Sequence, residues 1–149
     1  MKHFDFPNIE LKTKIVDGVT KVFDLVRKKY LVLTKEEFVR QHFIKYIHLH
    51  KGYPIGLIGV EKTINYNGMK IRADIIVYNN HGIAQMIVEC KAPEIKITQQ
   101  TFDQIARYNF NLKVPFLVVT NGISHFCCSV NYKSNQIIFL ESLPDFKDL

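Results

Sequence analysis

Residues 71–92 read IRADIIVYNNHGIAQMIVECKA, with two apolar runs on either side of the turn sequence NNHG at 79–82. Apolar runs separated by Asn and Gly predict two antiparallel strands joined by a turn. Successive side chains of a strand point to opposite faces. Glu89 and Lys91 should therefore share one face of the hairpin, while Cys90 points to the other face and into the core.

A third polar residue of this hairpin, Asp74, lies on its first strand. If Tyr78 faces Ile83 across the turn, Asp74 falls on the same face as Glu89 and Lys91 and lies diagonal to Glu89. Diagonal neighbours are about 7–8 Å apart at the backbone, which lets two carboxylates reach one cation. A turn one residue longer or shorter would put Asp74 on the opposite face, so this geometry depends on the register.

Two carboxylates on an otherwise apolar strand pair repel each other and resist desolvation. A divalent cation relieves both effects, and Mg²⁺ favours one or two carboxylates together with waters and substrate phosphates. Such a cation can polarise a phosphodiester and activate a water, while Lys91 neutralises developing negative charge. The alternative is a solvated face with a surface ion pair, because an Asp and a Glu-x-Lys arise often by chance.

The composition is that of a basic protein, with a formal charge of +6 and a pI near 9.2. This charge suits a polyanionic partner without proving one. Arg40, Arg72 and Arg107 are candidate phosphate contacts, although Arg72 could instead pair with Glu89 across the hairpin. The tight cluster Arg27-Lys28-Lys29 could contact phosphate or be a solvated run.

Other features bound the class of protein. The 149 residues are expected to form one domain, 1–149, because they contain no repeat, linker or low-complexity segment. No apolar run approaches a membrane span, and the N-terminus has no signal-peptide pattern, so a soluble cytoplasmic protein is expected. Three cysteines, two of them adjacent, predict buried free thiols rather than disulfides or zinc ligands.

Two helices are expected. Thr34 begins a capping box, in which its side chain caps the first turn and Glu37 reaches back to it. Thr98 caps the second helix, on which Gln104 and Tyr108 lie four residues apart and share a side. The full set of expected elements is a hairpin over 9–16 and 19–23, a segment over 23–34 that is either a short strand or an irregular arm, a helix over 34–50, strands over 55–66, 69–78 and 83–92, a helix over 98–112, a strand over 114–120, edge strands over 124–130 and 136–140, and a polar tail over 142–149.

The order of these elements predicts the topology. The strands over 55–92 form an antiparallel meander, with turns at Asn67-Gly68 and at 79–82. A strand, a helix and a further strand over 83–120 form a crossover unit, which makes the last strand parallel to the first. The fold class is therefore α/β, with a mixed sheet flanked by helices.

This order resembles the PD-(D/E)xK nuclease superfamily, and within it the N-terminal nuclease domain of type I restriction enzyme R subunits in a stand-alone form. The resemblance rests on RKKYLVLTKEEFVRQHF at 27–43, GYPIGLIGVEK at 52–62, IRADIIVY at 71–78, VECKAP at 88–93, QIARYN at 104–109 and VTNG at 119–122. It implies the restriction-endonuclease-like fold. It departs from type I R subunits in that the 149 residues contain no phosphate-binding loop for an ATP-driven motor.

The resemblance also implies roles in the site. Asp74 and Glu89 match the two acidic metal ligands, the carbonyl of Cys90 completes the ligand set, and Lys91 matches the catalytic lysine. The implied metal is Mg²⁺ or Mn²⁺.

Further site residues are implied on the two helices. Gln104 and Tyr108 match the Q-x-x-x-Y motif, which assists the site and the DNA; without the family they would read as a polar helix edge and a half-buried tyrosine. The early helix often adds an acid, for which Glu36 and Glu37 are candidates. Glu37 is favoured, although capping explains it equally well.

Two functions follow. The first is metal-dependent hydrolysis of DNA phosphodiesters, of restriction or repair type. The second is a non-catalytic DNA-binding or assembly module that serves a motor or specificity protein in trans. DNA is the expected partner in both cases, and a homodimer would supply the two sites that a double-strand cut needs.

Overall fold

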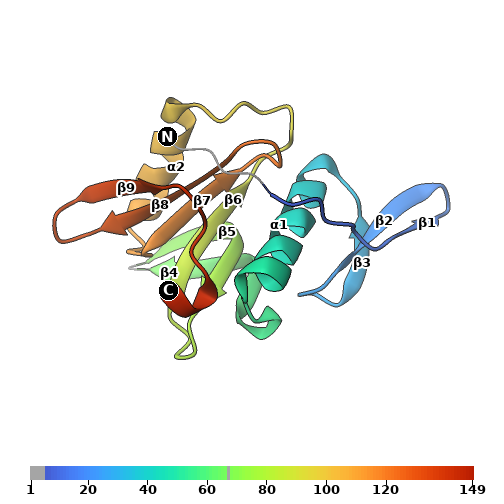
Figure 1. Ribbon diagram of the computed structural model, residues 1–149, viewed down its shortest axis with the longest axis horizontal. Coiled ribbons are helices and arrows are strands. Elements are labelled where there is room, and N and C mark those ends of the chain that lie inside the picture. The colour runs from blue at the N-terminus through green and yellow to red at the C-terminus, as the bar shows by residue number, and fades with distance from the viewer. Residues whose placement is uncertain (1–5, 67) are drawn as a thin grey trace.

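A six-stranded sheet forms the centre of the fold in the computed structural model, which describes residues 6–66 and 68–149 (Figure 1). Its strand order is β4-β5-β6-β7-β8-β9. Helices α1 (Lys35–Lys51) and α2 (Gln99–Phe110) pack against it. The strands are β4 (Ile58–Tyr66), β5 (Met69–Tyr78), β6 (Ala84–Cys90), β7 (Phe116–Thr120), β8 (His125–Asn131) and β9 (Gln136–Leu140). The predicted α/β class with a mixed sheet is confirmed.

Alternate residues of β6 supply two separate cores, as expected for a strand that is covered on both faces. Met86, Val88 and Cys90 pack with α1 residues such as Phe43, whereas Ile87 packs with the α2 residue Phe102. Val39, Phe43, Tyr46 and Ile47 of α1 follow helical spacing and are all buried, so they form the face of the helix that packs on the sheet. The sheet therefore lies between two helices, and Cys90 points into the α1 side as predicted.

The start of α1 follows the capping prediction only in part. The Thr34 hydroxyl accepts a hydrogen bond from the Glu37 backbone N–H at 3.1 Å, so Thr34 is the N-cap. The Glu37 carboxylate does not reach back to Thr34, because Arg27, Arg40 and Gln41 donate to its two oxygens. Charged donors compete successfully with the backbone for a carboxylate that is largely buried.

The β5–β6 hairpin has a different register from the predicted one. Tyr78 pairs with Ala84 rather than with Ile83, and a bulge follows, so that Ile75 pairs with Val88. The longer turn alone would have moved Asp74 to the wrong side of the sheet. The bulge inserts a second extra residue. When the resulting register is extended by one pair beyond Ile75 and Val88, it puts Asp74 level with Glu89 instead of diagonal to it.

The crossover prediction is confirmed, since β7 pairs with β6 in parallel. The prediction of two edge strands is wrong for β8, which lies between β7 and β9 and pairs with both; β9 is the edge. A strand from residue 55 was also expected, but residues Ile55–Leu57 form the 3₁₀ turn η1 before β4 begins. In the predicted Asn67-Gly68 turn, Gly68 has a positive φ of 79°, while Asn67 lies outside the described residues.

A second sheet precedes α1 in the chain. It contains β1 (Thr13–Val16), β2 (Val19–Asp24) and β3 (Lys29–Val32), which resolves the ambiguous segment after residue 23 as a strand. We call β1–β3 the N-terminal sheet. Figure 1 shows it on the side of α1 that faces away from the central sheet.

The C-terminal segment is not the polar tail that the sequence predicts. Leu143 is 1% exposed and belongs to the core on the α1 side. The Tyr53 hydroxyl donates to the Pro144 carbonyl at 2.9 Å, and the 3₁₀ turn η2 (Phe146–Asp148) follows. Phe146 and Leu149 also pack against this core, and these three apolar side chains anchor the segment, because fully burying a Leu alone contributes roughly 1.5–3 kcal/mol.

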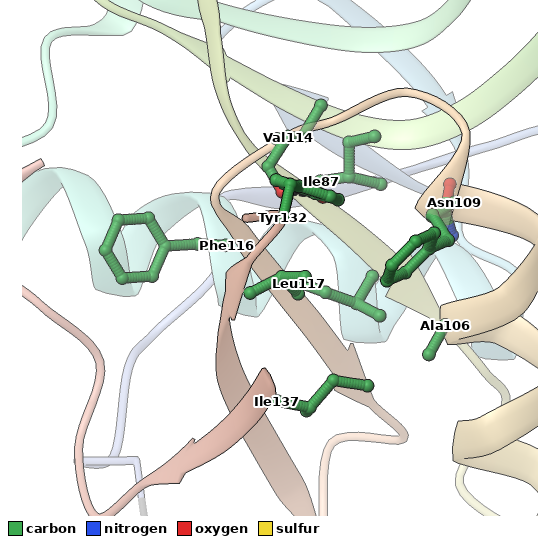
Figure 2. Close-up of a pocket in the computed structure, with 10 residues that line it drawn as sticks. Ile87, Ala106, Asn109, Val114, Phe116, Leu117, Tyr132 and Ile137 are labelled. Atoms are coloured by element: carbon green, nitrogen blue, oxygen red, sulfur yellow. Dashed lines mark hydrogen bonds between the residues drawn. The ribbon is translucent and has the colours of Figure 1, made fainter. Parts of the chain in front are cut away.

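Figure 2 shows an apolar pocket between α2 and the sheet, where Ala106 and Asn109 lie near Ile87 and Leu117. Its space for water is about 10 Å³. A space of this size holds one water at most, so we regard it as a packing defect rather than a ligand site. No helix within the described ranges is long and apolar enough to cross a membrane.

Candidate active site

Asp74 lies where the β4–β5 ladder is distorted. Ala73 packs on the α2 side and Ile75 on the α1 side, although an undistorted strand would put both on one face. Lys62 and Val60 of β4 pair with these two residues, while Glu61 between them has a left-handed φ of 50°. The alternation of side chains between the two faces of β5 is therefore interrupted at this point. As a result, the Asp74 side chain points toward the end of β6, where it contacts Cys90.

Two donors hold the Asp74 carboxylate. Oδ2 accepts the Cys90 backbone N–H at 2.7 Å, and Oδ1 lies 3.4 Å from Nη2 of Arg40. These contacts tie β5 to the end of β6 and to α1. The Cys90 backbone N–H therefore holds Asp74, while the role of the Cys90 carbonyl as a metal ligand stays a prediction.

Glu89 and Lys91 meet at the end of β6. Lys91 Nζ lies 3.2 Å from Glu89 Oε1, and both side chains are only about one-third exposed or less. The Lys91 backbone N–H donates to the Thr120 carbonyl, which fixes the chain just after the strand. Burial, and then the nearby negative charge of Asp74, raise the pKa of Glu89 above its ordinary value, while Lys91 opposes the shift.

This raised pKa predicts a gain in stability when the charge of Glu89 is removed. A carboxyl with a higher pKa when folded favours folding below the unfolded pKa of about 4.3, and that contribution is lost as the pH rises through the folded pKa. Glu89→Gln should therefore raise the free energy of unfolding at pH 7 in metal-free buffer. Urea denaturation at pH 7 and pH 4 measures the effect. The exposed Glu10→Gln is the control, and a Glu89→Gln gain that does not shrink at pH 4 contradicts the prediction.

The two acids of α1 have different surroundings. Both oxygens of Glu37 are occupied, Oε1 by Arg27 and Gln41 and Oε2 by Arg40. Glu36 is half-exposed, and its negative charge contributes to the raised pKa of Glu89. Of the two acids of α1, Glu36 is thus the one whose charge acts on Glu89, whereas Glu37, which the sequence favoured, belongs to a network of ion pairs.

Arg40 is the centre of that network. Its side chain is 4% exposed, and its guanidinium contacts the carboxylates of Glu36, Glu37, Glu61 and Asp74. Burial disfavours its charge, but the negative charges of Glu37, Asp74 and Glu61, in that order, raise its pKa above the ordinary value. Its Nε has no hydrogen-bond partner. A guanidinium enclosed in this way is not free to contact phosphate. The prediction that Arg40 contacts the phosphates of DNA is therefore wrong.

The other two predicted phosphate contacts are exposed arginines. The Arg72 side chain is 68% exposed and pairs with Glu61 at 3.2 Å, not with Glu89 as one alternative held. The shifted β5–β6 register moves Arg72 out of line with Glu89. On its other side Arg72 lies opposite Thr63 of β4, near Glu61. Arg107 lies on the exposed side of α2, at a groove that also contains Asp103.

Helix α2 contributes to the site from the opposite side of the sheet. An open groove is lined by Gln104, Ile105 and Asn109 of α2 together with Arg72, Ala73, Ile87 and Glu89. The structure thus brings Gln104 to the groove that contains Glu89. Tyr108 is within α2, but its side chain lies outside the described part of the protein.

The oxygen donors at the site suit a hard divalent cation that takes only a few of its ligands from the protein. Among residues 6–66 and 68–149, no three His, Cys, Asp or Glu side chains form a metal cluster. The negative charge of Asp74 adds to burial in raising the pKa of Glu89, so the two carboxylates lie near enough for their charges to interact. Two carboxylates with a nearby backbone segment match the few protein ligands that Mg²⁺ takes, the rest being water or phosphate oxygens.

Sequence reasoning missed the part that two residues, Arg40 and Glu61, take in organising this site. Arg40 of α1 contacts Glu61 of β4 and Asp74 of β5, at separations in sequence that leave no local pattern. The i,i+3 and i,i+4 spacing from Glu37 and Glu36 to Arg40 was a signal for ion pairing, though not for its role at Asp74.

Comparisons with known proteins agree with this architecture. Among curated proteins, none matches this chain. The fold is similar to the fragment structure of a protein described as an HsdR subunit of a type I restriction enzyme from Vibrio vulnificus, with a TM-score of 0.51 and 18% identity. That match covers 75% of this chain and 24% of the other, so this chain spans about a quarter of that fragment.

The sequence model of the family described as type I restriction enzyme R protein N terminus matches residues 35–144. The matched region contains α1, the central sheet and α2, and hence every side chain of the candidate site. Because the match covers most of the 149 residues, this chain belongs to the type I restriction enzyme R protein N-terminus family of restriction nuclease-related domains.

Proposed function

We propose that this chain, acting as one domain over residues 1–149, hydrolyses DNA phosphodiester bonds with a divalent metal, Mg²⁺ or Mn²⁺. The observation that carries the proposal is that Asp74 accepts from the backbone N–H of Cys90, the residue between Glu89 and Lys91, whose side chains pair with each other. The membership of the chain in a restriction nuclease-related family supports the same chemistry.

Asp74, Glu89 and the Cys90 carbonyl would hold the metal, with Glu36 rather than Glu37 as the acid from α1. When bound, the metal supplies Lewis-acid stabilisation of the phosphoryl oxygens and lowers the pKa of a water. Arg40 and the Cys90 N–H hold the Asp74 carboxylate in place before the metal arrives. Such preorganisation reduces the rearrangement that binding requires.

Lys91 acts on the substrate itself. Its ammonium lies beside Glu89 and is partly exposed, so it can donate to a phosphate oxygen or to the attacking water. Gln104, which lines the groove with Glu89, is placed to orient the DNA strand through its amide. Tyr108 keeps its proposed role as the second residue of the same helix motif.

The partners follow from the substrate and from the family. DNA is the substrate, and a motor or specificity protein acting in trans would deliver it, as the R-subunit resemblance implies. A homodimer would allow both strands to be cut. We place this activity in the cytoplasm, where cellular and invading DNA meet.

The test offers supercoiled plasmid, linear duplex, single-stranded and branched DNA to the protein with Mg²⁺, Mn²⁺ or EDTA. We expect metal-dependent cutting that is lost in Glu89→Ala, while DNA binding by Glu89→Ala persists. Lys133→Ala, exposed just after β8, is the folded control. If the wild type binds metal and DNA but cuts none of the four DNAs, the proposal fails in favour of a non-catalytic module that serves a partner protein.

A further inference from the structure

The N-terminal sheet carries positive charge that the candidate active site does not use. Residues 12–32, which read KTKIVDGVTKVFDLVRKKYLV, contain six basic and two acidic residues. This segment lies outside residues 35–144, the part that matches the restriction family. Its charge therefore calls for an explanation of its own.

One face of the sheet packs on α1 and the other is open. Val22 and Asp24 of β2 are fully buried, and Gln41 of α1 donates to Asp24. Residues that alternate with these, Lys21 and Phe23, must lie on the opposite face. This second face is turned away from α1 and from the central sheet.

Three lysines and two aromatic rings gather on the open face. Lys14 lies directly opposite Lys21 in the β1–β2 ladder. The ammonium of Lys12 lies 5.0 Å from the ring centre of Phe23, and that of Lys14 lies 3.8 Å from the ring centre of Tyr30. The two rings pack edge to face. The rings thus support two of the lysines and reduce the entropy lost when they are held in place.

The positive charge on this face meets no carboxylate in the part of the chain that the structure describes. Like charges directly opposite each other in a sheet are destabilising, so the Lys14–Lys21 pair carries a cost in the free protein. Within the described residues, no carboxylate pairs with Lys12, Lys14 or Lys21, and one of the two acids of the segment, Asp24, is buried on the other face. A polyanion would relieve this repulsion.

The N-terminal sheet is also connected to the candidate active site. Arg27, just after β2, lies 2.7 Å from Glu37 and 3.4 Å from Glu61. Glu61 in turn contacts Arg40, which contacts Asp74. The six residues of β2 extend about 20 Å outward from this junction. Duplex DNA presents a charge about every 1.7 Å along its axis, so a duplex at the site offers phosphates over that whole length.

We propose that the open face of the N-terminal sheet, through Lys12, Lys14 and Lys21, binds the phosphate backbone of duplex DNA whose adjoining segment occupies the candidate active site. The inference rests on the proposed function for the identity of the duplex. The contact is independent of base sequence, because lysine on phosphate reads charge alone.

Salt-dependent DNA binding in EDTA tests this contact without any cleavage. The variant Lys12→Gln/Lys14→Gln/Lys21→Gln is compared with the wild type on a labelled 30-base-pair duplex over a KCl series. We expect the slope of log K against log salt to become shallower by about two to three units, at roughly 0.9 per lost phosphate contact. The matched control Lys113→Gln/Lys133→Gln/Lys147→Gln removes equal charge from exposed positions after α2, after β8 and in η2, and its slope should stay within one unit of the wild type.

Each outcome separates this inference from the proposed function. Equal slopes of log K against log salt for the wild type and the N-terminal-sheet variant overturn the inference. A slope that becomes shallower by the same amount in the control variant as in the N-terminal-sheet variant also overturns it. Displacement of the duplex from the wild type by polyglutamate at equal charge also overturns it, in favour of an acidic protein partner. A wild type that shows the expected slope but never cleaves with Mg²⁺ leaves the inference standing and rejects the proposed hydrolysis.

Discussion

Lys91→Met should lower the single-turnover rate of DNA cleavage by about 10²–10⁴-fold, the range found when one acid–base group or one charge-stabilising donor is removed. Lys91 is the ammonium group next to Glu89, and its side chain is partly exposed, so its loss should not disturb the core. Methionine keeps the length and the apolar stem of the side chain. The measurement uses saturating DNA and Mg²⁺, with far-UV circular dichroism to verify folding.

The matched control is Lys96→Met, an exposed lysine in the connection between β6 and α2. It should stay within about threefold of the wild type, since surface substitutions usually shift energies by no more than about 0.5 kcal/mol. Lys91→Met should also keep its affinity for duplex in EDTA. A variant that retains a tenth or more of the rate would remove Lys91 from the chemical step.

Arg40→Met should lower the free energy of unfolding by about 3 kcal/mol, because breaking a buried ion pair on one side leaves buried carboxylates unpaired. Arg40 is almost wholly buried among four carboxylates from α1, β4 and β5. Glu37 keeps Arg27 and Gln41 as donors, which places the loss at the lower end of the range known for such pairs. Urea denaturation with an unchanged m-value measures it.

The matched control for this prediction is Arg72→Met. Arg72 shares the Glu61 partner, but its side chain is two-thirds exposed, so the loss should stay below about 1 kcal/mol. The deficit of Arg40→Met should also narrow as the pH falls. Carboxylates that lose their cation have higher pKa values in the folded state, which then binds protons more tightly than the unfolded state does. Equal losses in the two variants, or a deficit that widens on acidification, would contradict this account.

Local signals in the sequence were sufficient for most of the fold. The Thr34 cap, the turn at 79–82 and the apolar run before Thr120 each act within a few residues, through capping, backbone conformation and side-chain periodicity. The same signals predicted the parallel β6–β7 pair. They also placed Asp74, Glu89 and Lys91 in one hairpin, so the amino-acid sequence alone is enough to locate the candidate site.

Features that depend on contacts between residues far apart in the sequence were decided by the tertiary structure alone. The bulge in the β5–β6 hairpin, the diversion of Glu37 to Arg27 and Arg40, and the burial of Leu143 all arise from packing between elements. Arg40 meets Asp74 across 34 positions of sequence, where no periodicity or cap can signal the contact. Hydrogen-bonding patterns encode secondary structure locally, whereas the pairing of buried charges is settled only when whole elements come together and exclude water.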